Sequence, residues 1–321
     1  MSDPLFVLRG LTLALAWLLA MNVGAAGLVA IVARRWTTMA ATRSPAFWLS
    51  LRLAPAALSF AFVAAVFLPS YWRYEPRQLV EGIDLTLIAL AVAAIVLIVS
   101  AAARGVAAWR RASRRTRAWL ERARPLTLRE TSMPAFAIDA DTPVMALVGI
   151  VRPRLLITRG VLDAFTDEEL SASVAHEVRH RRAWDNLKRL AMCAAPDVLP
   201  WTSAARAIEQ QWASRSEHAA DREACDSRRA RCALASALVK VARLTPARTP
   251  IAEPISTLVD GGEIASRVQR LLDDGMPPEA VRPSPRNWIP VACLTAALIA
   301  GYAPLLRLVH GATEILVYML P

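Results

Sequence analysis

Cysteine is scarce in this chain, and its spacing carries no metal-binding or disulfide pattern. The 321 residues include four cysteines, and no two of them form a C-x-x-C pair. The sequence therefore indicates neither a disulfide framework nor a cysteine zinc site. Internal repeats and low-complexity linkers are also missing between residues 109 and 287, so we expect one polar domain there. The first apolar run has neither a basic leader nor an A-x-A cleavage site, which favours a retained helix over a signal peptide.

Long apolar runs, in contrast, are abundant. Hydrophobic residues make up 55% of the chain and the mean hydropathy is +0.34, which is more apolar than a soluble domain of this size needs. Four windows reach the ~20 residues that cross a bilayer, and the sequence therefore predicts an α-helical integral membrane protein with four spans. These windows are residues 11–33, 46–68, 85–103 and 289–306. Arg9, Arg52 and Arg307 lie within or beside them and are expected to snorkel or to face the helix bundle, with an ion pathway as the alternative.

The net charge of +11 is concentrated beside the predicted spans. Three arginines lie between the first two windows and eight follow the third, whereas the loop at 70–84 carries both signs. By the positive-inside rule, this distribution predicts that both termini lie outside and that the segment 107–287 is cytoplasmic.

The arginine-rich segment 107–124 raises the alternative of nucleic-acid binding. Such helices next to a span more often lie against anionic lipid headgroups, and no recognition helix is evident in the sequence. We therefore expect contact with membrane lipid and no direct contact with nucleic acid.

Three regions follow from this pattern: a three-helix membrane region at 1–106, a cytoplasmic domain at 107–287, and a fourth span with a short tail at 288–321. Short strands are predicted in the cytoplasmic domain at 126–129, 135–139, 144–148 and 155–158. Thr166 and Glu169 form a capping box, which predicts a helix that continues to about Met192. Further helices are predicted at about 203–228, 232–244 and 263–272.

The helix predicted after Thr166 contains the most specific motif of the chain. His176, Glu177 and His180 form an H-E-x-x-H pattern in a chain that has only four histidines. Residues at positions i and i+4 share a helix face, so both imidazoles can bind one metal ion while Glu177 reaches a water as a general base. A polar helix face that carries two histidines by chance is the alternative.

A catalytic zinc ion takes three protein ligands and keeps one position open. The next long helix offers Glu217 as the third ligand, with Asp221 one turn further on as a partner that orients a ligand histidine. His218 is the competing ligand, but it lies about 100° round the helix from Glu217, so both are not expected to reach one ion. Asp185, five residues after His180, is either another orienting partner or half of a surface ion pair.

These residues resemble a known family. Residues 175–187, A-H-E-V-R-H-R-R-A-W-D-N-L, are similar to the H-E-x-x-H-x-x-x-x-D-x-L signature of the bacterial beta-lactam sensor-transducer (antirepressor) family of membrane zinc metallopeptidases. Residues 149–157 match that family's G-x-x-x-P-x-[IL] approach to the catalytic helix, and residues 217–221 match its E-x-x-[AC]-D motif. Three spans before the domain and one after it extend the resemblance over nearly the whole chain.

The chain also departs from the best-known members of that family, because no penicillin-binding sensor domain follows the fourth span. Beta-lactam sensing is therefore not expected. The prenyl-protein and heat-shock membrane endopeptidase family shares the H-E-x-x-H and E-x-x-A-D motifs and is the related alternative.

The resemblance implies a gluzincin-type metallopeptidase domain, mainly α with a small edge sheet, that binds one Zn²⁺ per chain. His176, His180 and Glu217 would be the ligands, Glu177 the catalytic base, and Arg267 a candidate oxyanion stabiliser; a solvated helix face is the alternative for Arg267. Residues 146–149 are expected either to add the substrate as a further strand at a sheet edge or to form an internal strand.

The sequence thus predicts a zinc-dependent metalloendopeptidase of the bacterial inner membrane that acts on a cytoplasmic or membrane-proximal protein. By the resemblance, this substrate is a transcriptional repressor or an anti-regulator, and the spans transmit a signal. The alternative function is a non-proteolytic transducer or scaffold with a structural zinc site. An intact Glu177 argues against it, because a structural site needs no general base.

Overall fold

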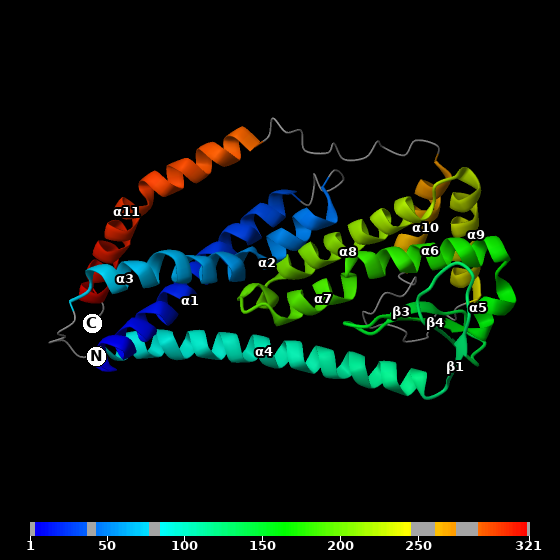
Figure 1. Cartoon of the computed structure of the whole chain (residues 1–321), viewed down its shortest axis with the longest axis horizontal. Coiled ribbons are helices and arrows are strands. Elements are labelled where there is room, and N and C mark those ends of the chain that lie inside the picture. Colours follow the sequence, from blue (N-terminus) through cyan, green and yellow to red (C-terminus); the bar gives the residue numbers. More distant parts are fainter. Residues whose placement is uncertain (1–3, 37–42, 77–83, 245–260, 274–287, 320–321) are drawn as a thin grey trace.

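The computed structural model describes residues 4–36, 43–76, 84–244, 261–273 and 288–319. The molecule is elongated and mainly helical. Long helices form one half of it, and a small sheet with shorter helices forms the other half (Figure 1).

Among the described residues, three helical segments are long and apolar enough to cross a membrane. They cover the first three predicted windows: α1 (Pro4–Trp36), a second segment in which α2 (Pro45–Phe62), the π-helical turn η2 (Val63–Phe67) and α3 (Leu68–Tyr74) follow one another, and α4 (Leu85–Leu120). α4 continues beyond its apolar part through the arginine-rich segment. The fourth window falls in α11 (Trp288–Met319), a continuous helix; that it crosses a membrane stays a prediction.

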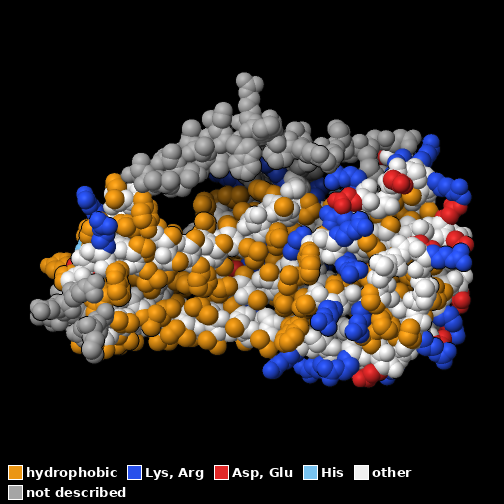
Figure 2. Space-filling model, viewed as in Figure 1, with side chains coloured by type: hydrophobic (Ala, Val, Ile, Leu, Met, Phe, Trp, Pro, Cys, Tyr) orange, Lys and Arg blue, Asp and Glu red, His pale blue; other side chains and the backbone are white. Residues whose placement is uncertain are grey.

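The surface of the molecule supports membrane association. Apolar side chains cover the visible face of the half formed by the long helices, whereas charged side chains gather over the half that contains the sheet (Figure 2). Large apolar side chains on the long helices are more than half exposed, among them Leu11, Leu28, Val96 and Val99. Such a surface is costly in water and stable in lipid.

The arginines predicted within or beside the spans have different environments. Arg9 is buried, and its Nη1 lies 3.7 Å from Glu75 Oε1. Arg52 is only 1% exposed and forms ion pairs with Asp197 and Glu209. These two arginines therefore face the interior, whereas Arg307 is exposed.

The sheet contains four strands in the order β1-β2-β4-β3. The strands are β1 (Ala123–Leu126), β2 (Ala135–Ile138), β3 (Met145–Val148) and β4 (Arg154–Thr158). β2 and β4 are parallel, and the other two pairs are antiparallel. β3 lies at the edge of this sheet, so residues 146–148 form an edge strand and not an internal one; that a substrate adds to this edge stays a prediction. The first strand is predicted at 126–129, but β1 lies three residues earlier, where Ala123–Leu126 pairs with β2.

The helices of this half begin with α5 (Arg159–Ala164) and α6 (Asp167–Ala183). The predicted capping box is confirmed: Thr166 Oγ1 accepts from the Glu169 amide, and the Glu169 carboxylate accepts from the Thr166 amide. Apolar residues of the sheet, α6 and the later helix α9 (Arg228–Leu244) share one core, which includes Leu155, Val174 and Leu238. This core holds α6 in place against the sheet.

The prediction of one helix from Thr166 to Met192 is wrong. Trp184 adopts a left-handed conformation, with φ of 58°, and ends α6; α7 (Asp185–Ala194) begins directly after it. The turn places Asp185 Oδ2 2.7 Å from His180 Nδ1, and this contact stabilises the turn.

α8 (Ser203–Ala224) follows a 3₁₀ turn, η3 (Leu199–Trp201), and α10 (Gly261–Leu272) matches the predicted amphipathic helix. The end of α8 and the start of α9 differ from the prediction by four residues each, at positions 224 and 228 instead of 228 and 232. Arg231 N donates to Ser227 O at 3.0 Å, so the first turn of α9 is already closed at that point.

Candidate metal centre

Three of the predicted site residues converge. His176 and His180 lie one turn apart on α6, and Glu217 faces them from α8. One ligand atom from each residue can be chosen so that all three lie within 4.8 Å of one another. This His-His-Glu group could hold a metal ion.

The separations of the facing atoms fit a single small cation. The two Nε2 atoms of His176 and His180 are 3.1 Å apart. Glu217 Oε2 lies 3.3 Å from His176 Nε2, and Glu217 Oε1 lies 3.4 Å from His180 Nε2. Nitrogen and oxygen ligands bound tetrahedrally to one zinc ion are about 3.4 Å apart. The observed spacings are close to that value.

The other nitrogen of each imidazole faces a carboxylate. His180 Nδ1 lies 2.7 Å from Asp185 Oδ2, and His176 Nδ1 lies 3.0 Å from Asp221 Oδ1. An ionised carboxylate only accepts, so in a neutral His180 imidazole Nδ1 carries the proton and Nε2 keeps its lone pair. The closeness of Asp221 to Nδ1 favours the same tautomer in His176. A bound cation satisfies these converging lone pairs, and the donor set therefore fits a metal.

Asp185 also forms an ion pair with Lys188, which is the alternative role that the sequence left open for it. Asp185 Oδ1 accepts from Lys188 Nζ at 3.2 Å, while Oδ2 accepts from Ser216 Oγ at 2.6 Å. The side chain of Asp185 is 5% exposed, so it belongs to the buried site rather than to the surface.

Two polar residues near the site, Ser216 and Asn186, make contacts that the sequence does not predict. Ser216 joins α8 to Asp185, and Asn186 Nδ2 donates to the backbone oxygens of Leu147 and Gly149, at 3.2 and 2.8 Å. Asn186 thereby ties the edge strand β3 to the start of α7. Adjacency to Glu217 and Asp185 was the only signal that the sequence offered for these two residues.

Arg267 on α10 enters the site, so the solvated-face interpretation is wrong. Its side chain is 3% exposed, and Nη1 lies 3.0 Å from Glu217 Oε2. Nε donates to Asp221 Oδ2 at 2.8 Å. Burial lowers the pKa of Arg267, but the carboxylates of Glu217 and Asp221 outweigh burial and raise it, so the guanidinium stays charged.

The pKa of Glu177 is shifted in the opposite direction from those of the other carboxyl groups of the site, because the pKa values of Asp185, Glu217 and Asp221 are lowered. The residue is 1% exposed, and Oε2 has no hydrogen-bond partner among the described residues. Burial raises the pKa of Glu177. A buried carboxyl with one free oxygen and increased proton affinity has the properties of a general base.

The charges around the imidazoles are unbalanced toward negative. Burial lowers the pKa of His180, but Glu217 and Asp185 outweigh burial and raise it to about 10. The site therefore attracts positive charge strongly, whether protons or a divalent cation. Among the described residues, four carboxyl groups, those of Glu177, Asp185, Glu217 and Asp221, outnumber the two cationic side chains that contact them, Arg267 and Lys188.

His218, the competing ligand, does not join the His-His-Glu group. Burial and the nearby Arg270 lower the pKa of His218 to about 4, so its imidazole is neutral near pH 7. A second group that could hold a metal, formed by Glu75, His310 and Glu314, contains an exposed residue and has Arg9 near Glu75. Because Glu314 is exposed, whereas none of His176, His180 and Glu217 is, the second group is the poorer cation site.

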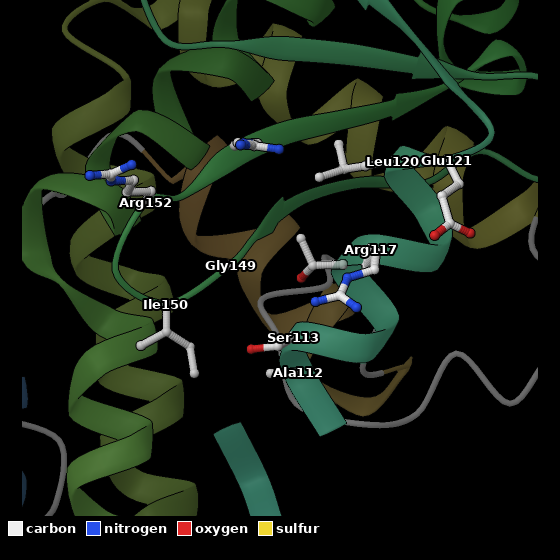
Figure 3. Close-up of a pocket in the computed structure, with 10 residues that line it drawn as sticks. Ala112, Ser113, Arg117, Leu120, Glu121, Gly149, Ile150 and Arg152 are labelled. Carbon is white, nitrogen blue, oxygen red and sulfur yellow. The ribbon is translucent and has the colours of Figure 1, made fainter. Parts of the chain in front are cut away.

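A cavity of about 480 Å³ lies between the C-terminal part of α4 and the turn that follows β3 (Figure 3). Arg117 lines it from α4, and Arg152 and Gly149 line it from the turn. None of the predicted site residues lines this cavity, but it adjoins the end of β3 that Asn186 holds.

No protein-family model matches the chain, and no curated protein sequence is significantly similar to it.

Proposed function

We propose that the chain is a membrane-embedded zinc-dependent metalloendopeptidase. One observation carries the proposal: two imidazole Nε2 atoms and the Glu217 carboxylate face one another at 3.1, 3.3 and 3.4 Å. Both Nδ1 atoms face carboxylates, which is the usual second contact of histidines that bind a metal. Two nitrogens and one carboxylate are a ligand set typical of catalytic zinc.

The surrounding residues fit peptide hydrolysis. Zinc bound by His176, His180 and Glu217 would supply Lewis acidity to a peptide carbonyl and to the attacking water. Glu177 accepts the proton of that water and passes it to the leaving amine. Arg267 lies close enough to Glu217 to stabilise negative charge that develops on the carbonyl oxygen.

The proposed location and substrate follow from the spans and the charges. Three candidate spans support a multi-pass protein, and the arginine distribution favours a cytoplasmic catalytic domain, outside termini and α11 as a fourth span. The substrate is then a cytoplasmic or membrane-proximal protein. The motif resemblance favours a bacterial transcriptional repressor or anti-regulator.

Replacement of the general base tests the proposal. We expect Glu177→Gln to slow casein cleavage by detergent-purified protein about 1000-fold, because general acid-base catalysis contributes roughly that factor. Glu223→Gln is the matched control, because Glu223 also lies near the site, on α8, but pairs with Arg179 and is 51% exposed. Cleavage by Glu177→Gln at the rate of the unmodified chain would show that this site is not a peptidase.

A further inference from the structure

The segment that joins α7 to α8, residues 195–202, is held by polar side chains from two of the candidate spans, α1 and α4. Asn22 of α1 donates through Nδ2 to Pro196 O at 3.0 Å and accepts from Val198 N at 3.1 Å. Arg104 of α4 donates to Ala195 O at 3.1 Å. These contacts satisfy backbone groups that no helix or strand pairs.

The third candidate span contributes Arg52, which makes the most extensive contacts. Its Nη1 donates to Asp197 Oδ2 at 2.8 Å, and its Nη2 donates to Met192 O at 2.9 Å. Its Nε donates to Glu209 Oε1 at 2.7 Å. Asp197 is fully buried. One guanidinium of α2 therefore bridges the end of α7, the connecting segment and α8.

The same helices are closely packed. α2 contacts α8, and α4 contacts α7. One apolar cluster combines Trp48 of α2 with Met192 of α7 and Ile208 of α8. A Cβ placed on Gly105 of α4 would lie 2.7 Å from Ala194 Cβ, so α4 and α7 leave no space between them at this point. Close-packed interfaces of this kind transmit displacement.

α7 and α8 also carry the metal centre. Asp185 begins α7 and holds His180, while Glu217 lies on α8. The hydrogen bond from Ser216 to Asp185 joins the two helices beside the imidazoles. Polar contacts thus join α7 to α8 both near the metal centre, through Ser216, and near the spans, through Arg52.

We propose that Arg52 is a positioning residue for the metal centre. Through Arg52, the packing of the spans sets how α7 and α8 present Asp185 and Glu217, and a change in that packing changes metal affinity. The effect on metal affinity rests on the proposed function, whereas the positioning of α7 and α8 by Arg52 does not.

The test compares full-length variants in detergent micelles. Arg52→Met removes the guanidinium but keeps a long side chain, and Asn22→Ala is a milder variant that removes two hydrogen bonds from the same segment. Arg9→Met is the matched control. Arg9 is also a buried arginine near a carboxylate, but it lies about 20 Å along α1 from Asn22.

Three measurements report on the site: zinc affinity by chelator competition, the absorption spectrum of the Co²⁺-substituted protein, and hydrogen exchange of α7 amides. We expect Arg52→Met to weaken zinc binding about tenfold, to change the cobalt spectrum and to speed exchange in α7. Arg52→Lys should recover only part of the loss, because an ammonium cannot copy the guanidinium fork. Arg9→Met should leave all three measurements as in the unmodified chain.

Several results would overturn the proposal. One is a folded Arg52→Met variant whose zinc affinity and α7 hydrogen exchange equal those of the unmodified chain. Another is a loss of zinc affinity in Arg9→Met as large as that in Arg52→Met. If Arg52→Met does not fold, Asn22→Ala is the deciding variant. We expect it to weaken zinc binding by a smaller factor than Arg52→Met would, and unchanged zinc affinity would contradict the proposal. If the unmodified chain binds no zinc, the proposed function fails; faster α7 exchange in Arg52→Met alone then still supports the positioning role, and equal exchange overturns it.

Discussion

The orientation of two imidazoles depends on two carboxylates from different elements. Asp221 reaches His176 from α8, and Asp185 reaches His180 from the first residue of α7. Both carboxylates are themselves held, Asp221 by Arg267 and Asp185 by Ser216. The imidazoles are therefore fixed before any ion binds, which lowers the entropy cost of binding.

Replacement of Asp185 tests this arrangement. We expect Asp185→Asn to weaken zinc binding by about 10- to 100-fold, because a neutral amide orients and polarises the imidazole less than a carboxylate does. Chelator competition measures the change. Asp163→Asn is the control, since Asp163 is 71% exposed and pairs only weakly with Arg159 at 3.8 Å. Unchanged zinc affinity in Asp185→Asn would contradict the role of Asp185.

Glu169 provides a pH-dependent prediction outside the metal centre. Its carboxylate accepts from Lys240 Nζ and from Ser236 Oγ, each at 2.6 Å, and so joins α6 to α9. Burial raises the pKa of Glu169, but the hydrogen bonds from Lys240 and Ser236 outweigh burial and lower it. The ionised form therefore stabilises the fold above the unfolded-state pKa of about 4.3, and this contribution is lost as pH falls through the lower folded-state pKa.

We expect Glu169→Gln to lower the free energy of unfolding by about 2 kcal/mol at pH 7, the cost of losing hydrogen bonds to a charged group. Melting temperatures of both proteins between pH 7 and pH 3 measure the effect. The difference should shrink as pH falls below the unfolded-state pKa of about 4.3 and through the lower folded-state pKa. A difference of the same size at pH 3 would contradict the assigned pKa direction.

At the scale of elements, the break at Trp184 is what brings Asp185 to His180. A non-glycine residue in the left-handed region is strained, and glycine relieves that strain at helix ends. We expect Trp184→Gly to be at least as stable as the unmodified chain, and Trp184→Val to be less stable than Trp184→Gly by about 1–2 kcal/mol. Melting temperatures of the two variants decide. Equal stability of the valine and glycine variants would show that the left-handed turn does not constrain this position.

The elements that the sequence predicted best are those whose signals are local. The capping box at Thr166 and the i, i+4 spacing of His176 and His180 depend only on helix geometry, and both are present in the structure. The break at Trp184 was missed because neither glycine nor proline marks it. It is stabilised by contacts of Asp185 with residues distant in the sequence, such as Ser216.

The same distinction explains the other outcomes in the candidate site. Glu217 could be chosen because helical spacing separates it from His218. The approach of Arg267 to the site was expected only from the resemblance and not from local spacing, because the preceding residues 245–260 give no sequence pattern that fixes where α10 packs. The contacts of Arg52 with Met192 and Asp197 join residues about 140 positions apart, and no periodic signal indicates such pairs.

At the scale of the whole molecule, an apolar half and a charged half meet at α7 and α8 (Figures 1 and 2). α11 joins the apolar half through polar contacts as well as packing. Tyr302 Oη donates to Ala65 O, and Ser70 Oγ donates to Leu306 O, each at 2.6 Å. These contacts place the helix that covers the predicted fourth window beside the second span.

The most direct measurement of the central claim is the zinc content of the purified full-length chain after dialysis, determined by mass spectrometry. We predict about one zinc per chain for the unmodified protein and for Glu177→Gln, because Glu177 is assigned to catalysis and not to metal binding. Glu217→Ala, which lacks one of three ligands, should retain far less. Absence of zinc from the unmodified chain, or an equal zinc content in Glu217→Ala, would contradict the assignment of this site.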